Sequence, residues 1–235
     1  MFNRLYLNIL YAEKEEAKKL GARWNPEKKQ WFFNGNPKDY VKFGKWLFDI
    51  KICERVYIIC DVLYILEGKR ECWKCKKETP VVGLGVEKFV EVYDTERNDE
   101  KGNPIYGIEM VGFNNEKELF VTWFYEEKEY PNFLLKYLKE NYDVKTGFSR
   151  IAGKNFANHC KYCGALQGNN FIFEEFDTPF SLTEESLKKN IEKIKNLRIK
   201  KIQLKENFIA SFSYGFSGNE YLYLKYGNIE NLILE

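Results

Sequence analysis

Short apolar runs alternate with polar turns along the first fifty residues, and this pattern is typical of a miniature α+β module. Gly21 stands just past the last position of the first amphipathic stretch, where a left-handed cap is needed, and Asn25-Pro26 marks a turn. The predicted elements are strands over 5–10 and 31–33 and helices over 11–20 and 38–48. A unit of this length approaches the smallest size at which a domain folds alone.

The rest of the chain mixes predicted strands with two predicted helices. Residues 55–66 form a strongly apolar run, which fits a buried strand or a short core helix and is too short to cross a bilayer. The other predicted strands cover 81–86, 89–93, 105–113, 119–124, 171–173, 201–204, 208–214 and 221–226. The first predicted helix covers 131–142.

A capping-box pattern at Ser181 and Glu184 opens the second predicted helix. This helix runs to about Asn196, and its apolar stripe consists of Leu187, Ile191 and Ile194. We expect an irregular segment over 147–158 and turns at 206–207 and 215–219.

Two Cys-x-x-Cys pairs stand far apart in the sequence and supply the most specific chemical signal. A pair of thiolates in a tight turn can bind one side of a metal ion, and two such turns complete the tetrahedral site of a structural zinc ion. The alternatives are two disulfides or four unrelated buried cysteines. The predicted ligands of a structural Zn²⁺ ion are Cys72, Cys75, Cys160 and Cys163. No secretory signal precedes them, so an oxidising compartment has no support.

The mixture of predicted helices and strands indicates an α+β fold class. The chain is expected to have three consecutive parts. Residues 1–50 form a small α/β module, and residues 51–176 form a zinc-ribbon-like domain. That domain is split by a long mixed insertion over 76–159, whose two ends the metal would join. Residues 177–235 form a C-terminal segment of a helix plus antiparallel strands. Cys53 and Cys60 lie in apolar sequence and are expected to be buried free thiols.

The overall composition excludes few classes of function, whereas the distribution of charge along the chain is more informative. The formal net charge of +2 gives no global electrostatic case for nucleic-acid binding. Residues 1–50 carry ten Lys and Arg against six Asp and Glu, residues 82–132 carry five against twelve, and residues 133–170 carry six against two. An acidic insertion is thus flanked by basic regions, and any phosphate contact is expected outside the insertion.

Basic residues crowd the cysteine pairs. The functional interpretation is a phosphate-contacting surface with an aromatic side chain stacked on a base. The structural interpretation is compensation for the charge of a tetrathiolate zinc site. The predicted contact residues are Arg70, Trp73, Lys74, Lys76, Lys77 and Lys161 at the cysteine pairs, and Arg23, Lys28 and Lys29 on the N-terminal module. Lys69, Tyr162 and Trp24 are further candidates, although Trp24 and Trp31 are expected in the module's core.

Catalytic signatures are sparse. His159, which directly precedes Cys160, is the single histidine of the chain and fits a supporting role in the turn or a place among the metal ligands. Glu174, Glu175 and Asp177 fit either a divalent-ion site or a solvated strand end. No P-loop, nucleophile elbow or metalloprotease helix is present, so the sequence favours a non-catalytic protein.

The stretch from Tyr11 to Phe32 contains Ala12-Glu13-Lys14, Glu16-Ala17-Lys18 and Leu20-Gly21-Ala22-Arg23-Trp24-Asn25-Pro26, followed by Lys29 and Trp31. It closely resembles a small bacterial domain of unknown function that occurs on plasmids and other mobile elements, sometimes attached to primase-like proteins. The resemblance covers roughly residues 4–47. The segments around the two cysteine pairs are similar to zinc knuckles in proteins that bear this domain. The resemblance implies no reaction and no catalytic residue.

The predicted function is that of a cytoplasmic zinc protein of phage or mobile-element biology that binds nucleic acid or a nucleic-acid enzyme. The alternative is a phage- or plasmid-encoded inhibitor of a host defence nuclease, similar in action to an anti-CRISPR protein and working by protein–protein contact. Basic residues at the cysteine pairs favour the first hypothesis. The acidic insertion and the near-neutral total charge favour the second.

Overall fold

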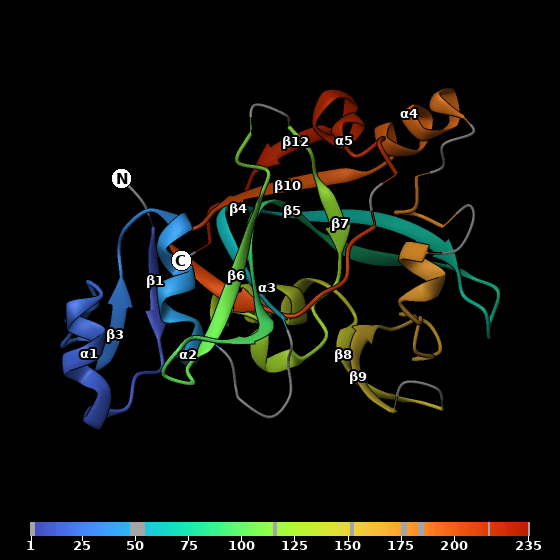
Figure 1. Ribbon diagram of the computed structural model, residues 1–235. Helices are drawn as coiled ribbons and strands as arrows, with labels where there is room; N and C mark the ends of the chain where they lie inside the picture. Colours follow the sequence, from blue (N-terminus) through green and yellow to red (C-terminus); the bar gives the residue numbers. More distant parts are fainter. Residues whose placement is uncertain are drawn as a thin grey trace. The chain divides into compact units, whose positions relative to one another are not determined.

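The computed structural model describes residues 3–47, 55–114, 117–150, 153–174, 178–182, 186–215 and 217–234. It contains helices together with mixed β-sheet, so the predicted α+β class is confirmed (Figure 1). The chain divides into two compact units, and each unit is assembled from separate stretches of sequence. The first comprises Met1–Asp61, Lys88–Asn114 and Leu204–Ala210, and the second comprises Val62–Glu87, Asn115–Gln203 and Ser211–Glu235.

The first unit begins with the N-terminal module. Strand β1 (Arg4–Leu7) pairs antiparallel with β3 (Gln30–Phe33), which pairs antiparallel with β2 (Arg23–Asn25) (Figure 1). The helical elements are η1 (Tyr11–Glu13), α1 (Lys14–Lys19), η2 (Pro37–Phe43) and α2 (Gly44–Leu47). Gly21 has a φ of +100° directly after the first helix, as its predicted capping role requires. The predicted strand over 31–33 and the predicted helical segment over 11–20 are confirmed. The predicted first strand ends at Leu7 rather than at residue 10, and the described part of the predicted helix over 38–48 is mostly the 3₁₀ helix η2. Strand β2 was not predicted.

Three further segments complete the first unit. The first part of β4 (Arg55–Glu71) pairs antiparallel with β11 (Glu206–Ala210), which runs parallel to β1. The last part of β5 (Glu78–Asn98) forms an antiparallel hairpin with β6 (Pro104–Val111). The core of the unit contains fully buried Leu5, Tyr40, Phe43, Ile58 and Val90.

The second unit contains the remaining parts of the two long strands. There β4 pairs antiparallel with β10 (Arg198–Gln203), and β5 pairs with β7 (Phe120–Thr122). Strand β12 (Asn228–Asn231) adds to β10 in parallel, and β8 (Val144–Ser149) forms a separate hairpin with β9 (Gly153–Asn158). The helical elements are η3 (Glu127–Glu129), α3 (Asn132–Asn141), the π-helical turn η4 (Asn170–Glu174), α4 (Leu187–Lys195) and α5 (Tyr221–Tyr226).

Two predicted strands are wrong, because the structure has helical turns at these residues. Residues 221–226 form α5, in which Leu222 and Tyr223 are buried. Their tyrosine–leucine alternation imitates a strand, and the two periods cannot be separated over six residues. Residues 171–173 lie in η4 rather than in a strand, with Ile172 fully buried and Phe171 exposed.

Two predicted loops are also wrong. The expected irregular segment over 147–158 is mostly the β8–β9 hairpin, whose polar and glycine-containing strands lack an alternating apolar pattern. The expected turn at Glu206 and Asn207 lies inside β11. Asn207 is buried there because its side-chain amide donates to the Tyr40 hydroxyl (2.7 Å) and its carbonyl oxygen accepts from the Asp61 amide (3.3 Å).

The C-terminal helix begins later than predicted. Ser186, rather than Ser181, caps α4 by accepting a hydrogen bond from the Lys189 amide, and Leu187 is exposed instead of belonging to the apolar stripe. Glu184 of the predicted capping box lies outside the described residues, as does Cys53. Cys60 is a buried free thiol, as predicted. Strands β10 and β11 are each antiparallel to β4, while β12 is parallel to β10.

The division into residues 1–50, 51–176 and 177–235 as separate folding parts stays a prediction. Strand β11, from the C-terminal part, belongs to the same compact unit as the N-terminal module. Among the helices of the described residues, none has the length and apolar character needed to cross a membrane.

Candidate metal centre

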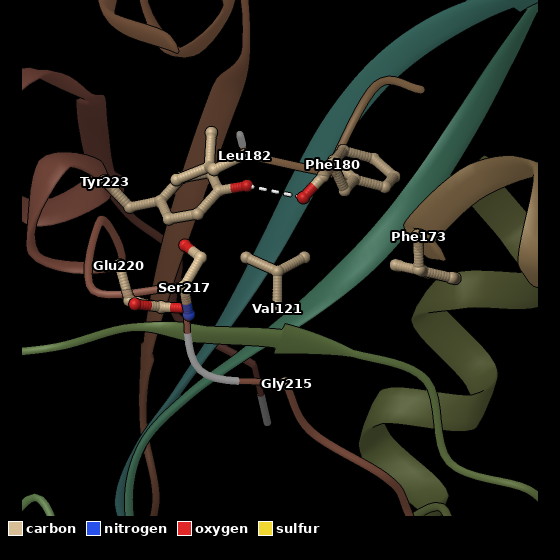
Figure 2. A pocket seen from close by; sticks show the side chains of 8 residues that line it. All are labelled: Val121, Phe173, Phe180, Leu182, Gly215, Ser217, Glu220 and Tyr223. Carbon is tan, nitrogen blue, oxygen red and sulfur yellow. Dashed lines mark hydrogen bonds between the residues drawn. The ribbon is translucent and has the colours of Figure 1, made fainter. Parts of the chain in front are cut away.

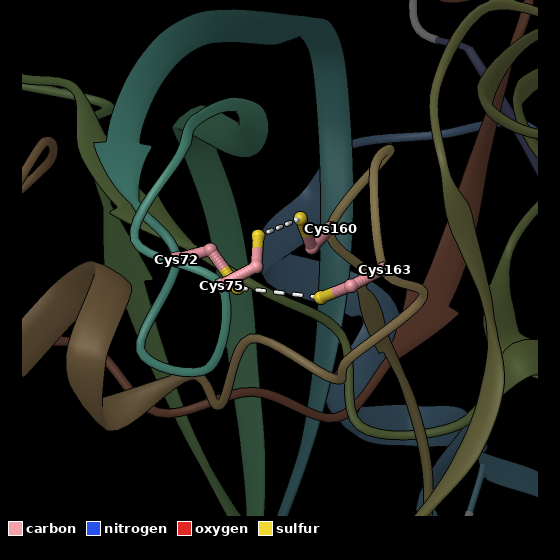
Figure 3. Close-up of side chains that lie close together, drawn as sticks. All are labelled: Cys72, Cys75, Cys160 and Cys163. Carbon is pink, nitrogen blue, oxygen red and sulfur yellow. Dashed lines mark hydrogen bonds between the residues drawn. The ribbon is translucent and has the colours of Figure 1, made fainter.

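Four cysteine sulfurs converge in the second unit. Cys72 and Cys75 lie between β4 and β5, and Cys160 and Cys163 follow β9, so two segments separated by the whole insertion meet here (Figure 3). All four Sγ atoms lie within 4.8 Å of one another. The Cys72–Cys163 and Cys75–Cys160 sulfur pairs are each 3.7 Å apart. A zinc ion with bonds of about 2.3 Å to each sulfur would set the sulfurs about 3.8 Å apart in a regular tetrahedron.

These distances decide between the alternatives left by the sequence. A disulfide bond places its sulfurs about 2.05 Å apart, whereas all four thiols here are free. Four unrelated buried cysteines would not share one point in space. The geometry therefore suits a single metal ion bound by four sulfurs.

Each cysteine pair sits in the same backbone turn, which we call a knuckle: residues 72–77 form knuckle 1 and residues 160–165 form knuckle 2. In knuckle 1 the Lys76 amide donates to the Cys72 carbonyl (2.9 Å), and the Cys72 amide donates to the Lys77 carbonyl (2.9 Å). In knuckle 2 the equivalent bonds, from Gly164 to Cys160 and from Cys160 to Ala165, are both 2.8 Å long. The residue after each second cysteine is left-handed, with φ values of 60° at Lys76 and 67° at Gly164.

Side-chain hydrogen bonds also join each knuckle to residues next to the other. The buried Gln167 amide donates to Cys72 Sγ (3.4 Å) and to the Ala165 carbonyl (2.8 Å). The Lys161 amide donates to Oγ1 of the buried Thr79 (3.1 Å), and the Trp73 indole donates to the Leu166 carbonyl (2.8 Å). Sequence reasoning missed Gln167 and Thr79 as supporting residues, because nothing local shows that their polar atoms are buried against the opposite knuckle.

The electrostatics of the four sulfurs favour a bound cation. Burial opposes ionisation of Cys160, but the backbone amides of Tyr162 and Cys163 and the neighbouring thiols lower its pKa to about 6. The amide of Ala165 lowers the pKa of Cys163, yet burial and the three other sulfurs raise it to about 11. Four thiolates crowded together repel one another, and a divalent cation removes that obstacle to full ionisation.

His159 has a supporting position rather than a ligand position. The group of mutually accessible ligand atoms consists, within the described residues, of the four sulfurs without a nitrogen of His159. The buried ring instead makes a 3.0 Å hydrogen bond with the Ala157 carbonyl, and burial lowers its pKa. A side chain at Gly147 would approach Nε2 to 2.5 Å, so the absence of a side chain there makes room for the ring.

Of the other predicted site residues, five exposed side chains on the two knuckles form the group that we call the rim: Trp73, Lys74, Lys77, Lys161 and Tyr162. Trp73 and Tyr162 are 55% and 52% exposed. The ammonium groups of Lys77 and Lys161 lie 5.2 and 5.0 Å from the centre of the Tyr162 ring, so cations from both knuckles gather at one aromatic side chain. In the described part of the chain, Lys74, Lys77 and Lys161 have no ion pair.

The remaining basic candidates near the knuckles are engaged. Lys76 pairs with Glu71 (3.8 Å), and Lys69 pairs with Glu78 (3.0 Å). The Arg70 guanidinium donates to the Phe171 carbonyl and lies 5.6 Å from that residue's ring centre. Of the candidate carboxylates, Glu175 and Asp177 lie outside the described residues, as does the side chain of Glu174.

The three basic candidates of the N-terminal module belong to the first unit. Lys28 binds both carboxylate oxygens of Glu206 (2.5 and 2.6 Å) and lies over the Tyr6 ring. Arg23 and Lys29 are exposed, and Lys29 has a left-handed φ of 51°. Trp31 is buried as expected, but Trp24 is 48% exposed and touches Trp31 by its edge.

Comparisons with known proteins concern the N-terminal module. Residues 4–47 match a family described as a domain of unknown function, DUF5710. A stretch of 43 residues is 44% identical to the DNA primase TraC of Escherichia coli, and this match covers 18% of the chain but 3% of the primase. The expected N-terminal domain of unknown function is thereby confirmed, whereas the knuckles lie outside the match to that domain. No solved structure matches the chain significantly.

Proposed function

We propose that the protein is a non-catalytic zinc protein of the cytoplasm whose rim binds single-stranded nucleic acid. The observation that carries this proposal is the coincidence of two exposed aromatic side chains with the three rim lysines at the four-cysteine centre. Base–aromatic stacking contributes about 1–3 kcal/mol per base, and lysines contact the intervening phosphates.

Zinc is the ion that best suits the centre. Four thiolates are soft ligands, and their near-tetrahedral spacing matches a closed structural site without an open position for substrate. Cys72, Cys75, Cys160 and Cys163 would hold the ion, which would join the two ends of the insertion. Its role is to fix the knuckles, and through them the positions of Trp73 and Tyr162.

Local charge determines what kind of binding to expect. A zinc ion with four thiolates carries a formal charge of −2, which the three rim lysines offset and slightly exceed. Stacking on the aromatic rings therefore contributes more to the proposed affinity than phosphate contacts do. Contacts to about three phosphates give a slope of about −2 for the logarithm of affinity against the logarithm of salt concentration.

The nucleic-acid setting agrees with the similarity of the N-terminal module to part of a DNA primase. That similarity covers a small fraction of the primase, so no activity of the primase is transferred here. The mobile-element context expected from the N-terminal motif belongs to the same proposal.

The test uses full-length protein purified without added metal. Elemental analysis should give about one zinc per chain, and a fluorescently labelled oligothymidylate should bind with the salt dependence given above. Reversing the rim charges (Lys74→Glu, Lys77→Glu and Lys161→Glu together) should lower the affinity at least tenfold while zinc stays bound. The matched control reverses the exposed lysines of α4 (Lys188→Glu, Lys189→Glu and Lys195→Glu), which have the same charge change in the same unit.

Equal affinities of the two triple variants would place the binding surface elsewhere. If the unmodified protein binds no oligonucleotide at physiological salt but captures a protein, that result would favour the inhibitor alternative over nucleic-acid binding. That alternative would use the acidic hairpin of β5 and β6. Asp99, in the connection of this hairpin, accepts hydrogen bonds from the Lys101 and Asn103 amides and the Asn103 side chain.

A further inference from the structure

Cavities occur in both units, and the charges of their lining residues differ. The cavity of the second unit drawn in Figure 2 has a volume of about 190 Å³ and is lined, among others, by Phe173, Phe180, Tyr223 and Glu220. A neighbouring cavity of about 290 Å³ shares Phe173 with it. Neither has a Lys or Arg among its described lining residues. The described walls of these two cavities therefore offer no cation to a negatively charged ligand.

A third cavity, of about 230 Å³, belongs to the first unit and lies within the N-terminal module. Its wall combines three aromatic residues, Tyr11, Trp24 and Trp31, with the cationic side chain of Lys29. Pockets for drug-sized ligands measure about 300–1,000 Å³, so this cavity suits a smaller planar group. An aromatic wall with a cation beside it fits a ligand that is both planar and anionic.

Two of the three aromatic rings are open to a ligand. Tyr11 is 80% exposed and Trp24 is 48% exposed, whereas Trp31 is buried. The rings of Trp24 and Trp31 meet edge to face, with their centres 5.4 Å apart and an angle of 63° between their planes, so the buried ring supports the exposed one. A single exposed aromatic residue needs no functional explanation, but two that line one cavity form a surface on which a base can stack.

The turn between β2 and β3 holds Lys29 in an uncommon backbone conformation. The Asn25 side-chain oxygen accepts hydrogen bonds from the amides of Glu27 (3.0 Å) and Lys28 (3.1 Å), which orders the turn. Lys29 follows with a left-handed φ of 51°, which few residues with a side chain adopt. The Lys28 ammonium is engaged by Glu206, whereas Lys29 has no ion pair in the described part of the chain. The turn thus places an unpaired cation at the cavity.

Further polar groups at the cavity suit the edge of a base and a phosphate. Nε2 of Gln30 donates to Oδ1 of Asn8 (3.2 Å), and both side chains line the cavity. This bond leaves the Asn8 amide to donate and the Gln30 carbonyl oxygen to accept, and an unpaired base presents both kinds of group along its edges. The Lys14 ammonium lies 3.7 Å from the centre of the Tyr11 ring and has no ion pair within the described residues, so it provides a second cation.

We propose that this cavity binds one base of a single-stranded nucleic acid, with the base stacked on Trp24 and the adjacent phosphates contacted by Lys29 and Lys14. The site goes beyond the proposed function, because it belongs to the first unit whereas the rim belongs to the second. It stands whether or not the rim binds nucleic acid. An acidic protein segment would also attract the lysines, but carboxylate side chains lack the planar faces that the exposed rings can stack on.

The experiment follows the indole N–H signals of the tryptophans, assigned by Trp→Phe substitution, by nuclear magnetic resonance while the full-length protein is titrated with an oligothymidylate. The signal of Trp24 should shift in a saturable manner, and that of Trp73 reports on the rim in the same titration. A shift of Trp73 without Trp24 overturns the cavity site and leaves the proposed function. A shift of Trp24 alone supports the cavity site and counts against the rim. If neither signal shifts, both proposals fall.

The decisive variant is Lys29→Glu, and its matched control is Lys19→Glu, which makes the same charge change at an exposed lysine of α1 that does not line the cavity. We expect the affinity reported by Trp24 to fall about tenfold with Lys29→Glu and less than about twofold with Lys19→Glu. The Trp46 indole, which donates to Glu13 (2.7 Å), shows through its own signal that the module stays folded. Equal effects of the two variants contradict the assignment of Lys29. A Trp24 shift caused by oligoglutamate but not by oligothymidylate contradicts a nucleic-acid ligand.

Discussion

Knuckle 1 and knuckle 2 share a backbone but differ in what surrounds it. Both have the same pair of backbone hydrogen bonds and the same left-handed residue after the second cysteine. Knuckle 1 connects the two longest strands, β4 and β5, whereas knuckle 2 stands between the short hairpin strand β9 and the turn η4. The Cys-x-x-Cys motif therefore determines the local turn, while the contacts that hold each turn in place come from elsewhere in the chain.

The largest effect should come from removing a sulfur from either knuckle. If the centre holds zinc as proposed, Cys72→Ser and Cys160→Ser should each lose the ion and lower the melting temperature sharply, because structural zinc contributes on the order of 10 kcal/mol to folding. If one ion joins both knuckles, the double variant should be no less stable than either single variant. Elemental analysis and thermal melts measure both properties.

Losses that add up in the double variant would mean that the knuckles act separately. A retained full equivalent of zinc in one single variant would likewise exclude a shared ion. Cys60→Ser is a useful control, since this buried thiol lies outside the cysteine cluster and its loss should leave the zinc content unchanged.

Each knuckle has one exposed aromatic residue, so the two knuckles can also be compared by their contribution to nucleic-acid binding. Trp73→Ala should weaken oligothymidylate binding by about 1–3 kcal/mol, and Tyr162→Ala should do so by a similar or smaller amount, because each is expected to stack on a base. Trp73→Phe keeps an aromatic face but loses the hydrogen bond to Leu166, so it separates stacking from knuckle positioning. Fluorescence anisotropy measures the affinity of each variant for the oligonucleotide, and the zinc content checks that the metal centre is intact. Equal weakening by Trp73→Phe and Trp73→Ala would assign the residue a positioning role.

Much of the centre followed from the sequence, because a spaced cysteine motif is a local signal. Both pairs were recognisable before folding was considered, and their convergence followed from the four ligands that a tetrahedral ion needs. Most of the N-terminal strands and helices, β2 excepted, were also predictable, because their apolar periods and turn residues agree.

What could not be predicted depends on partners that are distant in the sequence. Asparagine is typical of turns, yet Asn207 lies in a strand. Its side-chain amide donates to the Tyr40 hydroxyl and accepts from the Asp61 backbone amide, so both polar atoms have partners. Short segments such as 221–226 fit two periods equally, and the burial of Leu222 and Tyr223 decides between them.

A smaller effect should come from the contact that Thr79 makes across the knuckles. Thr79→Val keeps the shape of the buried side chain but leaves the Lys161 amide without its acceptor, at a cost of about 1 kcal/mol. Because this bond joins knuckle 2 to β5 just after knuckle 1, zinc release to a chelator should become faster. Thr122→Val is the matched control, since it removes a hydrogen bond to the Ser213 carbonyl away from the cysteines. Similar destabilisation with equal zinc release from both variants would show that the bond does not position the knuckle.

The smallest and most specific difference lies at the left-handed position of each knuckle. Lys76 adopts a φ of 60° that disfavours a residue with a side chain, whereas knuckle 2 has glycine there, and a Cβ on that glycine would have no atom within 4 Å. Gly164→Ala should therefore destabilise the protein by about 1 kcal/mol through backbone strain alone. Lys76→Gly should stabilise it by about 0.5 kcal/mol, because relief of strain exceeds the added flexibility of the unfolded chain and the exposed pair with Glu71 contributes little. Denaturant unfolding of the zinc-bound protein measures both signs. Destabilisation by Lys76→Gly equal to that of Gly164→Ala would show that the two turns are not equivalent in backbone energy, despite their matching hydrogen bonds.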